Sequence, residues 1–96
     1  MKEVFLVSFE NKAKAEELLK KDDLVSRGSI TIRSSGSLDI KEDGYFILID
    51  ASKEALEKAD ELLKGIAAKY KDAKKVIEKF DEEEERTMSG FGTLGL

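Results

Sequence analysis

Two stretches of the sequence decide its fold: Val4-Phe5-Leu6-Val7-Ser8-Phe9 and Tyr45-Phe46-Ile47-Leu48-Ile49. Both are rich in β-branched and aromatic residues, which favour β-strands. Both are also nearly continuously apolar, whereas a strand with one face in water alternates apolar and polar residues. The two stretches are therefore predicted to be strands that are covered on both faces.

The elements around these strands follow from shorter patterns. Asn11 is predicted to cap a helix over residues 12–21, in which Ala15, Leu18 and Leu19 share one face. Ser29 to Arg33 alternates strictly and is predicted to be a half-buried strand at an edge of the sheet.

The second half of the chain contains a long helical pattern and an ambiguous segment. Ser52 is predicted to cap a helix whose apolar residues recur at helical spacing from Ala55 to Tyr70. Residues 73–80 fit either a helix face or an edge strand. A strand is predicted, because it completes the order strand–helix–strand–strand–helix–strand.

This order predicts an α+β fold of the ferredoxin-like βαββαβ type, with an antiparallel sheet and both helices on one face. The domain is expected over residues 1–80, and residues 81–96 are expected to form an acidic segment and a Gly-rich apolar C-terminal tail. The tail is predicted either to dock against a protein partner or to be a disordered terminus.

One face of the two central strands has no helix over it in this prediction. That face carries either Val4, Leu6, Phe46 and Leu48 or the alternating set between them. A large apolar patch is unusual on a monomer, so self-association into a dimer or larger oligomer is expected. The alternative is that the tail or a third helix covers the face. The predicted interface consists of Phe5, Val7, Phe9, Tyr45, Ile47, Ile49, Phe91, Leu94 and Leu96.

Composition excludes several classes of site. The chain contains no Cys and no His, which removes thiol chemistry, zinc–thiolate sites and the usual general base near neutral pH. We expect no catalytic residue, no metal site and no cofactor. Gly90 to Gly95 spells a dinucleotide-binding pattern, but no helix follows it.

Charge and length set further expectations. The run Asp81 to Glu85 together with Arg86 accounts for the whole net charge of −4, so the rest of the chain is neutral. The abundance of Lys and Glu resembles the composition of proteins from hyperthermophiles. No apolar run is long enough to span a bilayer and no signal peptide is apparent, so a cytoplasmic location is expected.

Two groups of polar residues are candidate ligand contacts. Asn11, Asp50 and Ser52 follow the two central strands and are expected near a small ligand at a subunit interface. Arg33 and Ser35 begin a polar turn that is expected to hold an anion through its guanidinium and hydroxyl groups.

Parts of the two central strands resemble the strand signatures of RNA recognition motifs. Val4 to Val7 is similar to the first-strand motif, and Gly44-Tyr45 is similar to the start of the third-strand motif. Asp43, Phe46 and Ile47 depart from the pattern, at positions where the family has a basic residue, a Gly or Ala, and a stacking aromatic residue. This resemblance implies single-stranded RNA binding on the open sheet face, although basic residues are sparse there and nucleic acid is not the expected partner.

These observations predict a non-catalytic, homo-oligomeric interaction module. The alternative is a small-ligand-binding regulatory domain of the ACT type, and RNA binding is the weaker alternative. No pair of residues forms a recognisable catalytic set.

Overall fold

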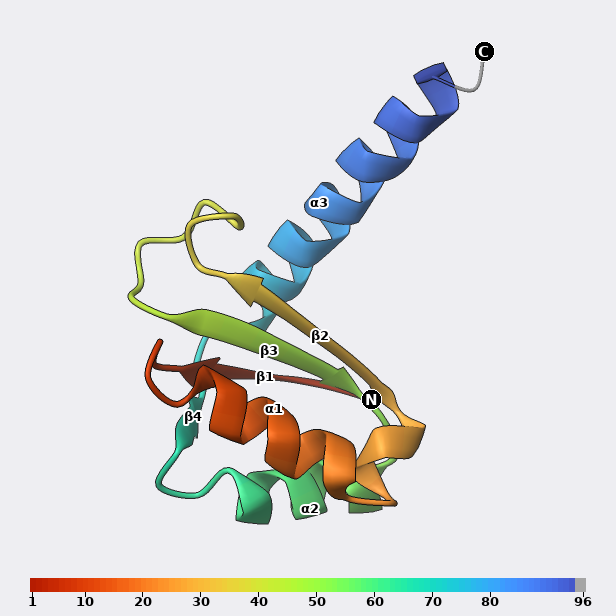
Figure 1. Ribbon diagram of the computed structural model, residues 1–96. Helices are drawn as coiled ribbons and strands as arrows, with labels where there is room; N and C mark the ends of the chain where they lie inside the picture. The colour runs from red at the N-terminus through yellow and green to blue at the C-terminus, as the bar shows by residue number, and fades with distance from the viewer. Residues whose placement is uncertain (95–96) are drawn as a thin grey trace.

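The computed structural model describes the backbone of residues 1–94 and the side chains of residues 1–84. This part of the chain forms an α+β fold with one four-stranded antiparallel sheet and three α-helices (Figure 1). The elements in chain order are β1 (Lys2–Val7), α1 (Lys12–Lys21), the 3₁₀ turn η1 (Val25–Arg27), β2 (Ser29–Ser34), β3 (Tyr45–Asp50), α2 (Lys53–Leu62), β4 (Ala67–Lys69) and α3 (Ala73–Leu94).

The strand order in the sheet is β2-β3-β1-β4, and all three pairings are antiparallel. The two strands that were predicted to be central, β1 and β3, are central, and β2 lies at an edge as predicted. Lys2 lies opposite Asp50 and Val7 lies opposite Tyr45, so β1 and β3 pair over their full length.

Helices α1 and α2 cover one face of the sheet, which we call the front face (Figure 1). Odd-numbered residues of β1 and β3 point to this face and pack against α1 and α2. Ser52 caps α2 as predicted, because its Oγ accepts a hydrogen bond from the Ala55 amide at 3.2 Å. Asn11 occupies the N-cap position of α1 as predicted, but its side chain makes no cap hydrogen bond.

The boundaries after α2 differ from the prediction. The helix ends at Leu62, because Gly65 adopts a φ of +80°, a conformation that ends helices and favours Gly. The chain then forms the fourth strand with Ala67–Lys69, which was predicted to be helical. Residues 73–80, predicted to be that strand, instead begin α3, in agreement with the helical spacing of Ala73, Val76, Ile77 and Phe80.

Helix α3 packs on the other face of the sheet, which we call the rear face. Val76 and Phe80 of α3 meet Val4 and Phe46 of the central strands in a second buried cluster. The loop between β2 and β3 completes this cluster with Leu38 and Ile40, which are 1% and 8% exposed. The expectation that the rear face needs a second subunit is therefore wrong for its centre, because the chain's own third helix and loop cover it.

Candidate functional site

The residues that were predicted to form an interface are divided by the structure. Phe5, Val7, Ile47 and Ile49 are at most 1% exposed beneath α1 and α2, so they belong to the core and are not available to a partner. Phe9 is 60% exposed. Phe91 and Leu94 lie within α3, but their side chains, like the whole of Leu96, are outside the described part of the chain.

The predicted ligand residues do not come together. Because β1 and β3 are antiparallel, the loops that follow them lie at opposite ends of the sheet. Asn11 is at one end, where its Nδ2 donates to the Ile66 carbonyl at 3.5 Å. Asp50 and Ser52 are at the other end, where the N-terminal amine lies 3.4 Å from Asp50 Oδ1. Asp50 and Ser52 line one hollow of about 410 Å³ together with Arg27, and Asn11 lies away from it.

Arg33 and Ser35 are used in internal contacts. Arg33 Nε donates to Glu83 Oε1 at 2.7 Å, which joins β2 to α3. The Ser35 hydroxyl is buried and donates to the Glu42 carbonyl, which closes the loop between β2 and β3. Both groups therefore already have hydrogen-bond partners within the chain.

The outer edge of β2 is the longer of the two open edges of the sheet. Within the described residues, β2 pairs with β3 on one side and with no strand on the other. The other edge strand, β4, has three residues, whereas β2 has six. A long unpaired edge is a template for pairing with another strand.

The direction of each backbone group along β2 can be worked out from the ladder. The Ser35 amide donates to the Gly44 carbonyl at 3.0 Å, one position beyond the Ser34–Tyr45 pair. Hydrogen-bonded and non-hydrogen-bonded pairs alternate in an antiparallel ladder. The backbone N–H and C=O groups that point toward β3 are therefore those of Ser35, Arg33, Thr31 and Ser29. The backbone groups of Ile30, Ile32 and Ser34 therefore face outward. In agreement, the Ile32 carbonyl accepts a hydrogen bond from Arg33 Nη1 at 2.9 Å.

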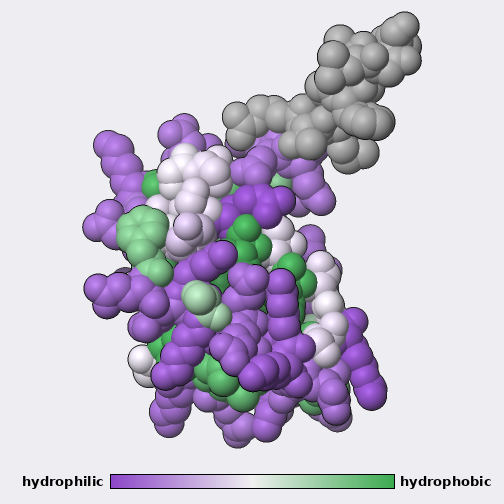
Figure 2. Space-filling model, viewed as in Figure 1, coloured by the Kyte–Doolittle hydropathy of each residue, from purple (hydrophilic) through white to green (hydrophobic). Residues whose placement is uncertain are grey.

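A shallow groove runs along this edge on the front face, with a volume of about 280 Å³. Its apolar wall consists of Ile30, Ile32 and Tyr45, all partly buried, and its rim consists of Lys12, Glu16 and Lys20 of α1. Figure 2 shows hydrophobic surface along β2 between purple regions.

The charges at the rim of this groove are paired with one another. Glu16 lies 3.1 Å from Lys20 and 3.4 Å from Lys12. The hydrogen bond from Lys20 is the main cause that holds the pKa of Glu16 below its ordinary value, and Lys12 acts in the same direction. Lys12 Nζ also lies 5.4 Å from the centroid of the Tyr45 ring. The rim therefore carries a formal charge of +1, with the single carboxylate of Glu16 shared between two lysines.

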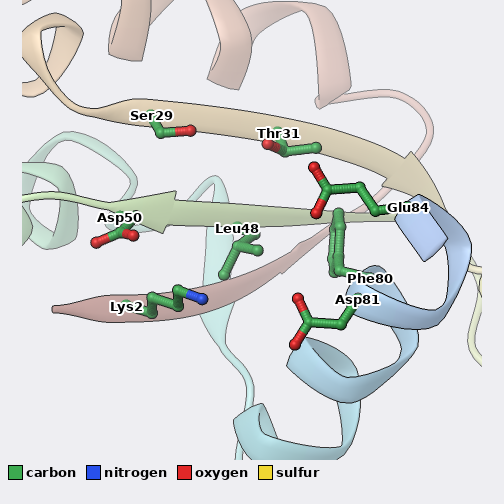
Figure 3. Close-up of a pocket in the computed structure, with 8 residues that line it drawn as sticks. All are labelled: Lys2, Ser29, Thr31, Leu48, Asp50, Phe80, Asp81 and Glu84. Carbon is green, nitrogen blue, oxygen red and sulfur yellow. The ribbon is translucent and has the colours of Figure 1, made fainter. Parts of the chain in front are cut away.

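A second hollow of about 180 Å³ lies on the rear face beside α3 (Figure 3). The sheet contributes Lys2, Ser29, Thr31, Leu48 and Asp50, and α3 contributes Phe80, Asp81 and Glu84. In Figure 3, Phe80 and Glu84 project from α3 toward the strands. This corner is the part of the rear face that α3 leaves uncovered.

Neither hollow contains a grouping of metal ligands among its described residues. Among the residues with described side chains, no three Asp, Glu, His or Cys residues are grouped to hold a metal ion. The described helices are also too short or too polar to cross a membrane.

Comparison with known proteins returned no relative. No family model, curated protein or solved structure matches this chain. The open edge of β2 was not singled out from the sequence, although its signal was present. Ser29 to Arg33 alternates like an edge strand and contains neither Pro nor Lys, two residues that commonly protect such edges.

Proposed function

We propose that this protein is a non-catalytic module that associates with itself through the outer edge of β2. The observation that carries this proposal is the row of outward backbone groups on Ile30, Ile32 and Ser34. Two isoleucine side chains that are only partly buried lie on the same strand. Pairing would satisfy the Ile30 backbone groups and the amides of Ile32 and Ser34, and it would remove apolar surface from water. The carbonyls of Ile32 and Ser34 already accept hydrogen bonds from Arg33 and Ser37.

The proposal includes a finer description of the fold. We take the sheet and its first two helices to be a ferredoxin-like βαββαβ unit, supported by the strand order β2-β3-β1-β4 and by the position of α1 and α2 on one face. Helix α3 is then an addition to that unit, and it occupies the face on which a second subunit was first expected.

The two alternative functions have less support, although Asp50 and Ser52 line a hollow with Arg27. The loops that were to hold a small ligand lie at opposite ends of the sheet. The sheet face that was to stack RNA bases carries α3 across Val4 and Phe46. Self-association is therefore the function that the described surface supports best.

The test is the mass of the protein in solution. We expect sedimentation equilibrium of the wild-type protein, over a range of about 1–100 µM, to give a dimer or a larger oligomer. The variant Ile32→Lys places a charge on the edge and should weaken association by about tenfold or more. A wild-type protein that is monomeric over the whole range would overturn the proposal.

A matched control places the same charge on the other edge of the sheet. Ala68 is exposed on β4, so Ala68→Lys should leave the mass unchanged. Thermal unfolding of both variants checks that they fold, since Ile32 also packs against the front core. Equal weakening by both variants would show that added charge, and not the β2 edge, controls association.

A further inference from the structure

We infer that two copies pair β2 with β2 in antiparallel orientation, with Thr31 of each copy on the two-fold axis. This inference rests on the proposed self-association and adds the register and the geometry of the partner. A second copy is the occupant that fits best, because an antiparallel two-fold axis brings the same row of donors and acceptors against itself.

The residues that face outward limit the possible registers. Outward backbone groups belong to even-numbered residues, so a two-fold pairing must match even with even. With Thr31 on the axis, Ile30 of each copy lies opposite Ile32 of the other copy, which gives two equivalent pairs. The arrangement forms about four main-chain hydrogen bonds and gathers four isoleucines on the front face, where apolar cross-strand pairs are stabilising.

The rear face supports the same register. Arg33 binds Glu83 at 2.7 Å, so α3 passes the edge of the sheet beside Arg33 and continues beyond it to Leu94 (Figure 1). With Thr31 on the axis, Arg33 lies opposite the partner's Ser29. In each chain, Ser29 of β2 pairs with Asp50 of β3, and Asp50 pairs with Lys2 of β1. These three residues line the uncovered corner shown in Figure 3.

The length of α3 matches this corner. Residues 85–94 extend α3 by about 15 Å, and three neighbouring strands span about 10 Å. The helix of each copy would therefore cross β2, β3 and β1 of the other at the place that the other copy's own helix leaves open. In a dimer with this two-fold axis, each uncovered corner is thus covered by α3 of the other copy.

The absence of Cys makes the register directly testable. The variant Thr31→Cys carries one thiol, which at a non-hydrogen-bonded position on the axis lies within reach of its symmetry mate. The control Ser29→Cys lies on the same strand and face, but its two thiols would be about 13 Å apart along the strands. Under mild oxidation, Thr31→Cys should form a disulfide-linked dimer about tenfold faster or more than Ser29→Cys.

The possible results separate the two proposals. Preferential coupling of Thr31→Cys supports the register. A protein that is dimeric in sedimentation, but in which Ser29→Cys couples as fast or Thr31→Cys does not couple, overturns the register and leaves self-association standing. A monomeric protein with no coupling overturns both. Circular dichroism of the reduced variants confirms that each is folded before oxidation.

Discussion

The two faces of the sheet are both buried, but by different means. The front face is covered by two amphipathic helices, α1 and α2, that follow their strands directly in the chain. The rear face is covered by one helix from the end of the described fold and by the loop between β2 and β3. An apolar strand face therefore indicates that the face is buried, but it does not indicate which element covers it.

The largest test of this comparison uses one Phe on each face. Phe5 points to the front and Phe46 to the rear, and their exposed fractions are 1% and 0%. We expect Phe5→Ala and Phe46→Ala each to lower the free energy of unfolding by about 3–5 kcal/mol, as measured by urea denaturation. A cost below about 1.5 kcal/mol for Phe46→Ala alone would show that α3 does not pack on the rear face as described.

The loop between β2 and β3 gives the next largest effect. Leu38 is 1% exposed although it lies in a loop, so Leu38→Ala should cost about 2–4 kcal/mol. Lys41→Ala, an exposed position in the same loop, should change the stability by less than about 0.5 kcal/mol. Equal small effects in urea denaturation would show that the loop does not belong to the rear core.

The smallest expected effect is a pH dependence on the rear face. Tyr70 packs edge-on against Phe46, and its hydroxyl donates to Glu42 Oε2 at 2.9 Å. This hydrogen bond is the main cause that raises the pKa of Tyr70 above its ordinary value. A raised pKa in the folded state means that the folded protein holds this proton more tightly than the unfolded chain does.

The sign of the pH dependence follows from this difference. The contribution of Tyr70 to stability is complete below the ordinary tyrosine pKa of about 10 and is lost as the pH rises through the higher value of the folded protein. The variant Tyr70→Phe keeps the contact between this ring and Phe46 but removes the hydroxyl group that titrates. The wild-type melting temperature should therefore fall more steeply above about pH 10 than that of the variant. Parallel curves for the two proteins would show that the hydrogen bond has no effect on stability.

Much of the fold could be predicted because its signals are local. The strands β1 and β3, the edge position of β2, the helix at Lys12–Lys21 and the cap at Ser52 all follow from hydrophobic spacing and short-range hydrogen bonding. The exchange of strand and helix between residues 67 and 80 was missed, because an amphipathic pattern continues through Gly65 and only the positive φ there breaks it.

The candidate surface was less predictable for a different reason. The alternation in Ser29 to Arg33 indicates an edge strand, but which backbone groups face outward depends on the register with β3. The predicted ligand residues failed for the same kind of reason. Asn11 and Asp50 each follow a central strand, and the antiparallel pairing of those strands separates them.

By itself, the sequence determined that two strands are covered on both faces, because only burial accounts for continuous apolar runs. It also determined that thiol and histidine chemistry are absent. Only the tertiary structure decided that α3 and the loop carrying Leu38 cover the rear face and that the outer edge of β2 stays open. Those outcomes depend on contacts between residues far apart in the chain, which hydrophobic periodicity does not encode.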